Sequence, residues 1–82
     1  MRKIEVGRVY RHFKGDHYLV EALAQDAASG EICVVYRKLY GDGGLWVRPF
    51  SEFAGPVDRA KYPNADQEYR FQLLEIESTA GH

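Results

Sequence analysis

Short runs of apolar residues, separated by small polar segments, follow one another along most of this chain. Within the runs, β-branched and aromatic residues are frequent and often alternate with polar ones, which is typical of strands. The run 31–40 shows this most clearly, while the alanines of 17–26 could support a helix but are not at helical spacing. The pattern therefore predicts five strands, over residues 8–13, 17–26, 31–40, 45–50 and 68–77.

Glycines mark the tight connections between these predicted strands. Segment 14–16 indicates a hairpin turn, in which Gly15 is free to adopt a positive φ. The Gly-Asp-Gly-Gly segment 41–44 is the clearest turn of the chain, because its glycines suit the primed turns of hairpins. Ser51 is placed to cap one helical turn, SEFA, and residues 55–67, with two prolines and no periodicity, indicate a loop.

Five short strands joined by tight turns cannot fill two stacked sheets in a chain of 82 residues. We therefore expect a mainly β fold: a small SH3-like barrel of about five antiparallel strands with one short helical turn. The length suits a single domain over residues 1–82, with its core in about 7–77 and with frayed ends.

Composition places this domain away from membranes. No apolar run approaches the roughly 18 residues that span a bilayer, and the first residues lack the apolar centre of a signal peptide, so we expect a cytoplasmic protein. Cys33 is the single cysteine, which excludes an intramolecular disulfide and a cysteine-based metal cluster. Its apolar surroundings predict a buried, unreactive thiol.

Charge is distributed unevenly, although the formal net charge is only −1. Residues 1–14 and 32–48 are basic, and the segments after each are acidic, so a basic face forms if the two basic blocks meet in space. Because side chains alternate along a strand, one face of each basic strand interleaves aromatic rings with cations. The predicted ligand-binding residues on these faces are Tyr10, His12, Lys14, Tyr36, Tyr40, Trp46 and Arg48.

Rings beside cations suit stacked bases and phosphates, and they also suit extended peptides. We therefore expect a non-enzymatic recognition module for single-stranded nucleic acid or a peptide, with no cofactor and no metal. In the opposing interpretation, the same rings are core residues, and Lys38 and Arg48 lie along them at the rim. Two further alternatives are an oligomer-forming or protein-interaction domain and, less favoured, a small metal-dependent hydrolase around His12, Asp16 and His17.

Several runs resemble a family of short, mostly bacterial proteins known as domain of unknown function 1653. They are VYRHFKGDHYLV, VVYRKLYGDGGLWVRPFSEF and YRFQLLEI, and the likeness extends from about Gly7 to Leu74. The segment 55–67 matches the family only loosely. The resemblance implies a single cytoplasmic β domain, and it brings no assigned activity and no catalytic residues.

Overall fold

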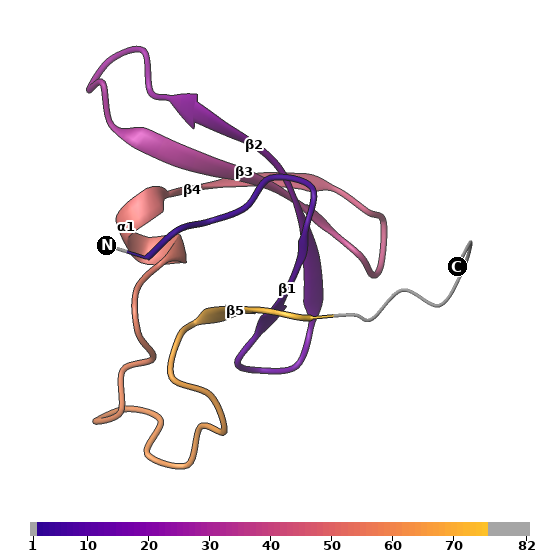
Figure 1. Cartoon of the computed structure of the whole chain (residues 1–82), viewed down its shortest axis with the longest axis vertical. Coiled ribbons are helices and arrows are strands. Elements are labelled where there is room, and N and C mark those ends of the chain that lie inside the picture. The colour runs from indigo at the N-terminus through magenta and orange to yellow at the C-terminus, as the bar shows by residue number, and fades with distance from the viewer. Residues whose placement is uncertain (1, 76–82) are drawn as a thin grey trace.

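The computed structural model describes residues 2–75, which form one antiparallel sheet and one short helix (Figure 1). The elements are β1 (Val9–His12), β2 (His17–Gln25), β3 (Ile32–Lys38), β4 (Leu45–Pro49), α1 (Phe50–Phe53) and β5 (Phe71–Leu73). The strand order in the sheet is β4-β3-β2-β1-β5. The prediction of a mainly β fold with five antiparallel strands and one helical turn is confirmed.

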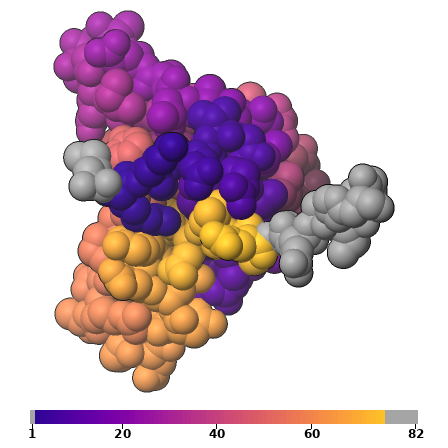
Figure 2. Space-filling model, viewed as in Figure 1, coloured from indigo at the N-terminus to yellow at the C-terminus, as the bar shows by residue number. Residues whose placement is uncertain are grey.

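The sheet is open, because β4 and β5 form its two edges and are not paired with each other within residues 2–75. The closed barrel expected from the sequence is therefore not confirmed. Strand β2 is the longest element and carries a β-bulge between Val20 and Ala22, where the register skips Glu21. A bulge bends its strand. Beyond the bend the β2–β3 hairpin projects from the body of the molecule, at the upper left of Figure 2.

The two predicted hairpin turns are present, and each relies on a glycine. Gly15 has a φ of +115°, between β1 and β2. In the turn between β3 and β4, Gly41 and Gly43 have φ values of +57° and +66°, and the Gly43 N–H donates to the Tyr40 carbonyl at 3.1 Å. A positive φ at the first central residue is the feature of the primed hairpin turns.

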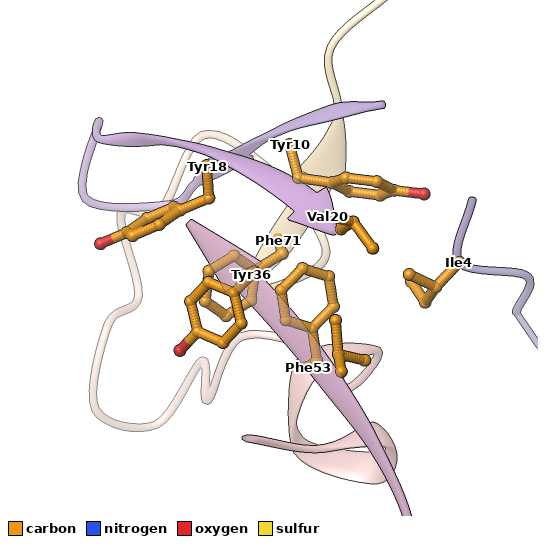
Figure 3. Packing of buried hydrophobic residues seen from close by; sticks show 8 residues of the cluster. Ile4, Tyr10, Tyr18, Val20, Tyr36, Phe53 and Phe71 are labelled. Atoms are coloured by element: carbon orange, nitrogen blue, oxygen red, sulfur yellow. The ribbon is translucent and has the colours of Figure 1, made fainter. Parts of the chain in front are cut away.

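Aromatic rings fill most of the core, and their flat faces and edges meet at its centre (Figure 3). Phe53 stacks on Phe71 with ring centroids 4.1 Å apart and planes 7° apart. The rings of Tyr10 and Tyr36 meet Phe53 at 5.6 and 5.2 Å. Tyr18, Val20 and Val34 complete the centre from the sheet. The core thus joins α1 to the sheet, whose edge strand β5 supplies Phe71.

Helix α1 begins one residue earlier than predicted, and Pro49 is its N-cap. Ser51 lies inside the helix, and no side chain caps the N-terminus of the helix. The predicted capping role of Ser51 is therefore wrong. The helix has only four residues, and no helix in the described part of the chain is long and apolar enough to cross a membrane. Its structural contribution is Phe53, which is fully buried.

The N-terminal segment is anchored, so the predicted fraying is wrong for residues 2–5. Ile4 is buried in the core, and the Glu5 N–H donates to the Tyr10 hydroxyl at 2.9 Å. Arg2 donates to the Ala54 and Phe71 carbonyls, and its guanidinium lies 4.0 Å from the Tyr69 ring centroid. A single apolar residue among charges gives no periodic pattern, which is why the sequence did not indicate this contact. The last strand is shorter than predicted, and residues 76–77 of that prediction lie outside the described residues.

Cys33 is only half-buried, so the prediction of a buried thiol is wrong. Strand β3 is apolar on both faces, and Val34 and Tyr36 point into the core while Cys33 occupies the other face. Partial desolvation, with help from the carboxylates of Glu31 and Asp26, raises the pKa of the thiol. A raised pKa keeps the thiol protonated at neutral pH, which limits its reactivity without burial.

Candidate functional site

A pocket of about 360 Å³ lies where the β1–β2 turn, β4 and the long loop between α1 and β5 meet. We call it the basic pocket, because four of its side chains are cations and one is a carboxylate. It is lined by His12, Phe13, Lys14, Arg48, Asp58, Lys61, Tyr62 and Arg70.

The β1–β2 turn presents the first side chains of the basic pocket. The His12 N–H donates to the Asp16 carbonyl at 2.8 Å, and the Gly15 N–H donates back to the His12 carbonyl at 2.7 Å. The Lys14 N–H donates to His12 Nδ1 at 3.1 Å. Because Nδ1 accepts this bond, the neutral imidazole carries its proton on Nε2. The tight turn therefore fixes both the position and the tautomer of His12.

Arg48 enters the pocket from β4, and its guanidinium is held on several sides. Its Nε donates to the Tyr36 hydroxyl at 3.2 Å, and Nη1 donates to Glu52 at 3.4 Å. The group also lies 5.7 Å from the Phe71 ring centroid. Restraint by these contacts lowers the entropy that Arg48 would lose when it binds an anion.

The long loop supplies the remaining side chains of the pocket, and in Figures 1 and 2 it forms the orange lower part of the molecule. Asp58 organises a turn, because its carbonyl accepts the Tyr62 N–H at 2.8 Å and its carboxylate accepts the Ala60 N–H at 3.1 Å. Lys61 and Tyr62 follow directly from this turn. Arg70 is placed by its backbone, since its carbonyl accepts the Phe13 N–H at 2.9 Å.

Gln67 anchors this loop to the sheet. Its side-chain amide is buried and donates to the carbonyls of Arg11 at 2.9 Å and Tyr69 at 2.8 Å. Its side-chain oxygen accepts from the Arg11 guanidinium. Arg59 closes the loop from the other side by donating to the Gln67 carbonyl at 3.0 Å. A loop without regular structure is thus held in one conformation by side-chain hydrogen bonds.

The electrostatic potential in the basic pocket is positive. Partial burial lowers the pKa of His12, and the cations Lys14, Arg48 and Arg70 lower it further, against the opposing effect of Asp16. The imidazole is therefore neutral at pH 7. The ammonium groups of Lys14 and Lys61 lie 5.3 and 5.6 Å from the Tyr62 ring centroid. Two ammonium groups and a neutral N–H donor thus border one space.

A second surface adjoins the pocket, and we call it the aromatic surface: Lys38, Tyr40 and Trp46. The Trp46 side chain is 47% exposed and Tyr40 is 38% exposed. The Lys38 ammonium lies 5.5 Å from the Tyr40 ring centroid and 5.3 Å from that of Trp46, and it forms an ion pair with Asp42 at 2.8 Å. The Trp46 ring is 6.4 Å from the Tyr36 ring, whose hydroxyl contacts Arg48, so the two surfaces are connected through Tyr36.

The structure divides the predicted ligand-binding residues into three groups. His12, Lys14 and Arg48 line the basic pocket, and Tyr40 and Trp46 lie on the aromatic surface. Tyr10 and Tyr36 are each 1% exposed and belong to the core, as the opposing interpretation had it for Tyr36. The Tyr36 hydroxyl alone reaches the edge of the site, where it contacts Arg48.

Sequence reasoning missed Phe13, Asp58, Lys61, Tyr62 and Arg70. Phe13 follows β1 and belongs to the turn, so the alternation of side chains along the strand does not predict where its ring lies. The other four lie in or directly after the loop without periodicity. The only available signal was the cluster of cations and a tyrosine in the run DRAKY.

His12, Asp16 and His17 do not form a metal site in the structure. Within residues 2–75, no group of three or more histidine, cysteine, aspartate or glutamate side chains is arranged to hold a metal ion. His12 Nδ1 is occupied by the Lys14 N–H. The alternative of a metal-dependent hydrolase gains no support from this geometry.

Comparisons with known proteins agree with the resemblance noted in the sequence. The sequence profile of the family described as "Protein of unknown function (DUF1653)" matches residues 8–73. The fold is similar to the crystal structure of a protein belonging to DUF1653 from Bordetella bronchiseptica. The TM-score is 0.74 at 34% sequence identity, covering 95% of this chain and 96% of that one. No curated protein matches the chain. The match over most of the sequence and the shared fold show that the chain belongs to the DUF1653 family.

Proposed function

We propose that this domain is a non-enzymatic recognition module that binds single-stranded nucleic acid across the basic pocket and the aromatic surface. The observation that carries the proposal is the convergence of four cations, Lys14, Arg48, Lys61 and Arg70, on one pocket beside exposed rings. Cations neutralise phosphates, and flat rings provide area on which bases stack.

The exposed rings favour a nucleic acid over an acidic peptide. Carboxylates of a peptide would use the cations of the pocket and would leave Tyr40 and Trp46 without a matching group. Bases would stack on these rings, with a gain of about 1–3 kcal/mol for each stacked base. The Lys38 ammonium beside both rings is paired with Asp42 at 2.8 Å, so stacking on the rings is the contribution proposed for this surface.

The near-neutral net charge supports weak and local binding. A formal net charge of −1 provides no general attraction for polyanions. The favourable field is confined to the basic pocket and its surroundings. The proposed ligand is therefore a short strand chosen by the shape of the site.

An NMR titration with a pool of short single-stranded oligonucleotides and a pool of acidic peptides tests the proposal. We expect chemical-shift changes for the backbone of residues 12–15, 46–48 and 61–62 with oligonucleotides. Lys61→Ala should weaken them at unchanged stability, because Lys61 is exposed. Lys3→Ala is the matched control, since it removes one charge from an exposed position that does not line the pocket. Shifts with acidic peptides alone, or with neither pool, would reject nucleic-acid recognition.

We further propose that the open sheet is a partly closed form of the SH3-like barrel expected from the sequence. The support is the chain order of four strands, a short helix and a fifth strand, together with the bulge in β2. Curling at such a bulge would bring the sheet edges toward each other around the core.

The location that we propose for the protein is the cytoplasm, as expected from the sequence.

A second candidate function is interaction with another protein chain, or with a second copy, through the edge strand β4. Leu45, Trp46 and Val47 are 52%, 47% and 64% exposed, and an exposed apolar edge strand is a template for pairing. Sedimentation velocity over a range of protein concentrations tests it. A mass that rises with concentration, and that Val47→Lys returns to the monomer, would favour this candidate.

A further inference from the structure

We infer that the basic pocket binds the terminal phosphate of the strand, a phosphate monoester, in preference to an internal phosphodiester; this inference rests on the proposed function. The two ligand groups differ in charge. A monoester carries a charge of about −1.5 to −2 at neutral pH, whereas a diester carries about −1.

The charge balance of the basic pocket matches the monoester. Four cations line it, and two carboxylates offset them: Asp58 in the wall, and Glu52, which binds Arg48 at 3.4 Å. Asp58 is already engaged with the backbone N–H groups of Ala60 and Lys61. An excess of positive charge therefore remains around the space even with Asp16 near His12, and a dianionic group would offset it more fully than a single diester.

The unused donors of the pocket also match a group with three terminal oxygens. Within residues 2–75, the ammonium groups of Lys14 and Lys61 have aromatic neighbours but no carboxylate or carbonyl partner. The Arg48 guanidinium uses Nε and Nη1, and in the same part of the chain its Nη2 has no acceptor. These donors come from the turn, the loop and β4, so they approach a ligand from different sides. A monoester presents three terminal oxygens, and a diester presents two.

His12 adds a donor that carries no net charge. Its Nδ1 accepts the Lys14 N–H, so the proton of the neutral ring is on Nε2. The ring is fixed against Phe71, with centroids 4.9 Å apart. A dianion in the pocket would favour protonation of this imidazole, which would strengthen the bond between them.

The test compares three oligonucleotides of one short sequence, which carry a 5′-phosphate, a 3′-phosphate or hydroxyl groups at both ends. Fluorescence of Trp46, the single tryptophan, reports binding without a label. We expect at least one phosphorylated strand to bind about tenfold more tightly than the hydroxyl strand, a difference of about 1.4 kcal/mol. Inorganic phosphate should reduce this advantage by competition.

Variants locate the effect in the basic pocket. Lys14→Ala and Lys61→Ala should each remove most of the advantage of the phosphorylated strand, and Lys3→Ala should retain it. Equal affinity for all three strands overturns the inference and leaves the proposed function standing. An advantage that survives both pocket variants also overturns it. Failure of every strand to bind overturns the proposed function as well.

Discussion

Gly43 shows how much a single backbone angle contributes to this fold. Its φ is +66°, and a Cβ atom built there would meet only the Lys38 carbonyl oxygen, at 3.8 Å. The space is therefore sufficient, and the cost of a side chain would be conformational. We predict that Gly43→Val lowers the free energy of unfolding by about 1–2 kcal/mol, because β-branched residues resist a positive φ. Urea denaturation followed by circular dichroism measures the change.

Gly43→Asn is the matched control for this prediction. Asparagine tolerates the left-handed region better than other residues with a side chain, so the loss should be clearly smaller. Equal stability of the wild type and the valine variant would contradict the assignment of this turn.

His12 makes stability depend on pH in a definite direction. Its pKa is lowered in the folded protein, chiefly by partial burial and then by Lys14, so at mildly acidic pH the unfolded chain binds more protons than the folded one. The stability that comes from the neutral ring is fully present above the unfolded pKa of about 6.5 and is lost as the pH falls below it. We predict that the wild type loses more stability than His12→Gln between about pH 7.5 and pH 5.5.

Two carboxylates have lowered pKa values in the folded protein and respond to acid at lower pH than His12. Hydrogen bonds from the backbone of Ser29 and Ala28 lower the pKa of Asp26, and Lys38 lowers the pKa of Asp42. Their contributions are lost only at lower pH, below the usual range of carboxylates. Identical pH profiles for the wild type and His12→Gln would show that the imidazole is not held neutral by the fold.

Alternation along the strands predicted which residues share a face, but it did not settle which face is buried. In β3 both faces are apolar, so the burial of Tyr36 and the half-buried position of Cys33 followed only from the packing of α1 and β5 on one side. Tyr10 was placed with His12 correctly, yet its ring points into the core. Trp46 pairs with Tyr36 across β3 and β4, so it lies on the face of the sheet that covers the core. It remains 47% exposed because β4 is the edge of the sheet.

At the scale of elements, α1 acts mainly through Phe53. This ring is fully buried, stacks on Phe71 and meets the rings of Tyr10 and Tyr36. We predict that Phe53→Ala costs about 3–5 kcal/mol, because the cavity would lie among rigid rings that cannot collapse into it. Denaturant unfolding compares this variant with Phe50→Ala, which truncates a half-buried ring of the same helix.

Phe50→Ala should cost clearly less than Phe53→Ala. If Phe53→Ala is unfolded in water, Phe53→Leu, which retains most of the volume, should remain folded with a lower melting temperature. Equal costs for the two alanine variants would contradict the central place of Phe53.

The strands and their turns could be predicted because β-branched residues and glycines leave local signals. The loop between α1 and β5 left none, since its conformation depends on Gln67 and Arg59, whose partners lie in other segments or on the loop backbone. Half of the basic pocket belongs to this loop and to Arg70. For that reason the candidate site was only partly accessible to sequence reasoning.

At the scale of the whole molecule, the distribution of charge sets the salt dependence of binding. A single strand contributes a slope of about −0.7 in the logarithm of affinity against the logarithm of salt concentration for each neutralised phosphate. With one or two phosphates neutralised by the cations of the basic pocket, we predict a slope between about −0.7 and −1.4. Titrations at several salt concentrations measure it, and a much steeper slope would indicate contacts over a larger part of the surface.

The anchoring of the long loop also affects the stage of folding at which the basic pocket forms. Gln67 binds the backbone of Arg11, 56 positions away in the chain, so the pocket exists only after the largest loop of the domain has closed. Contacts across such separations carry a large entropic cost during folding, and they form late. A ligand that contacts both sides of the pocket cannot bind before the long loop has closed. Stopped-flow experiments should therefore show that it slows unfolding and leaves the rate of folding unchanged.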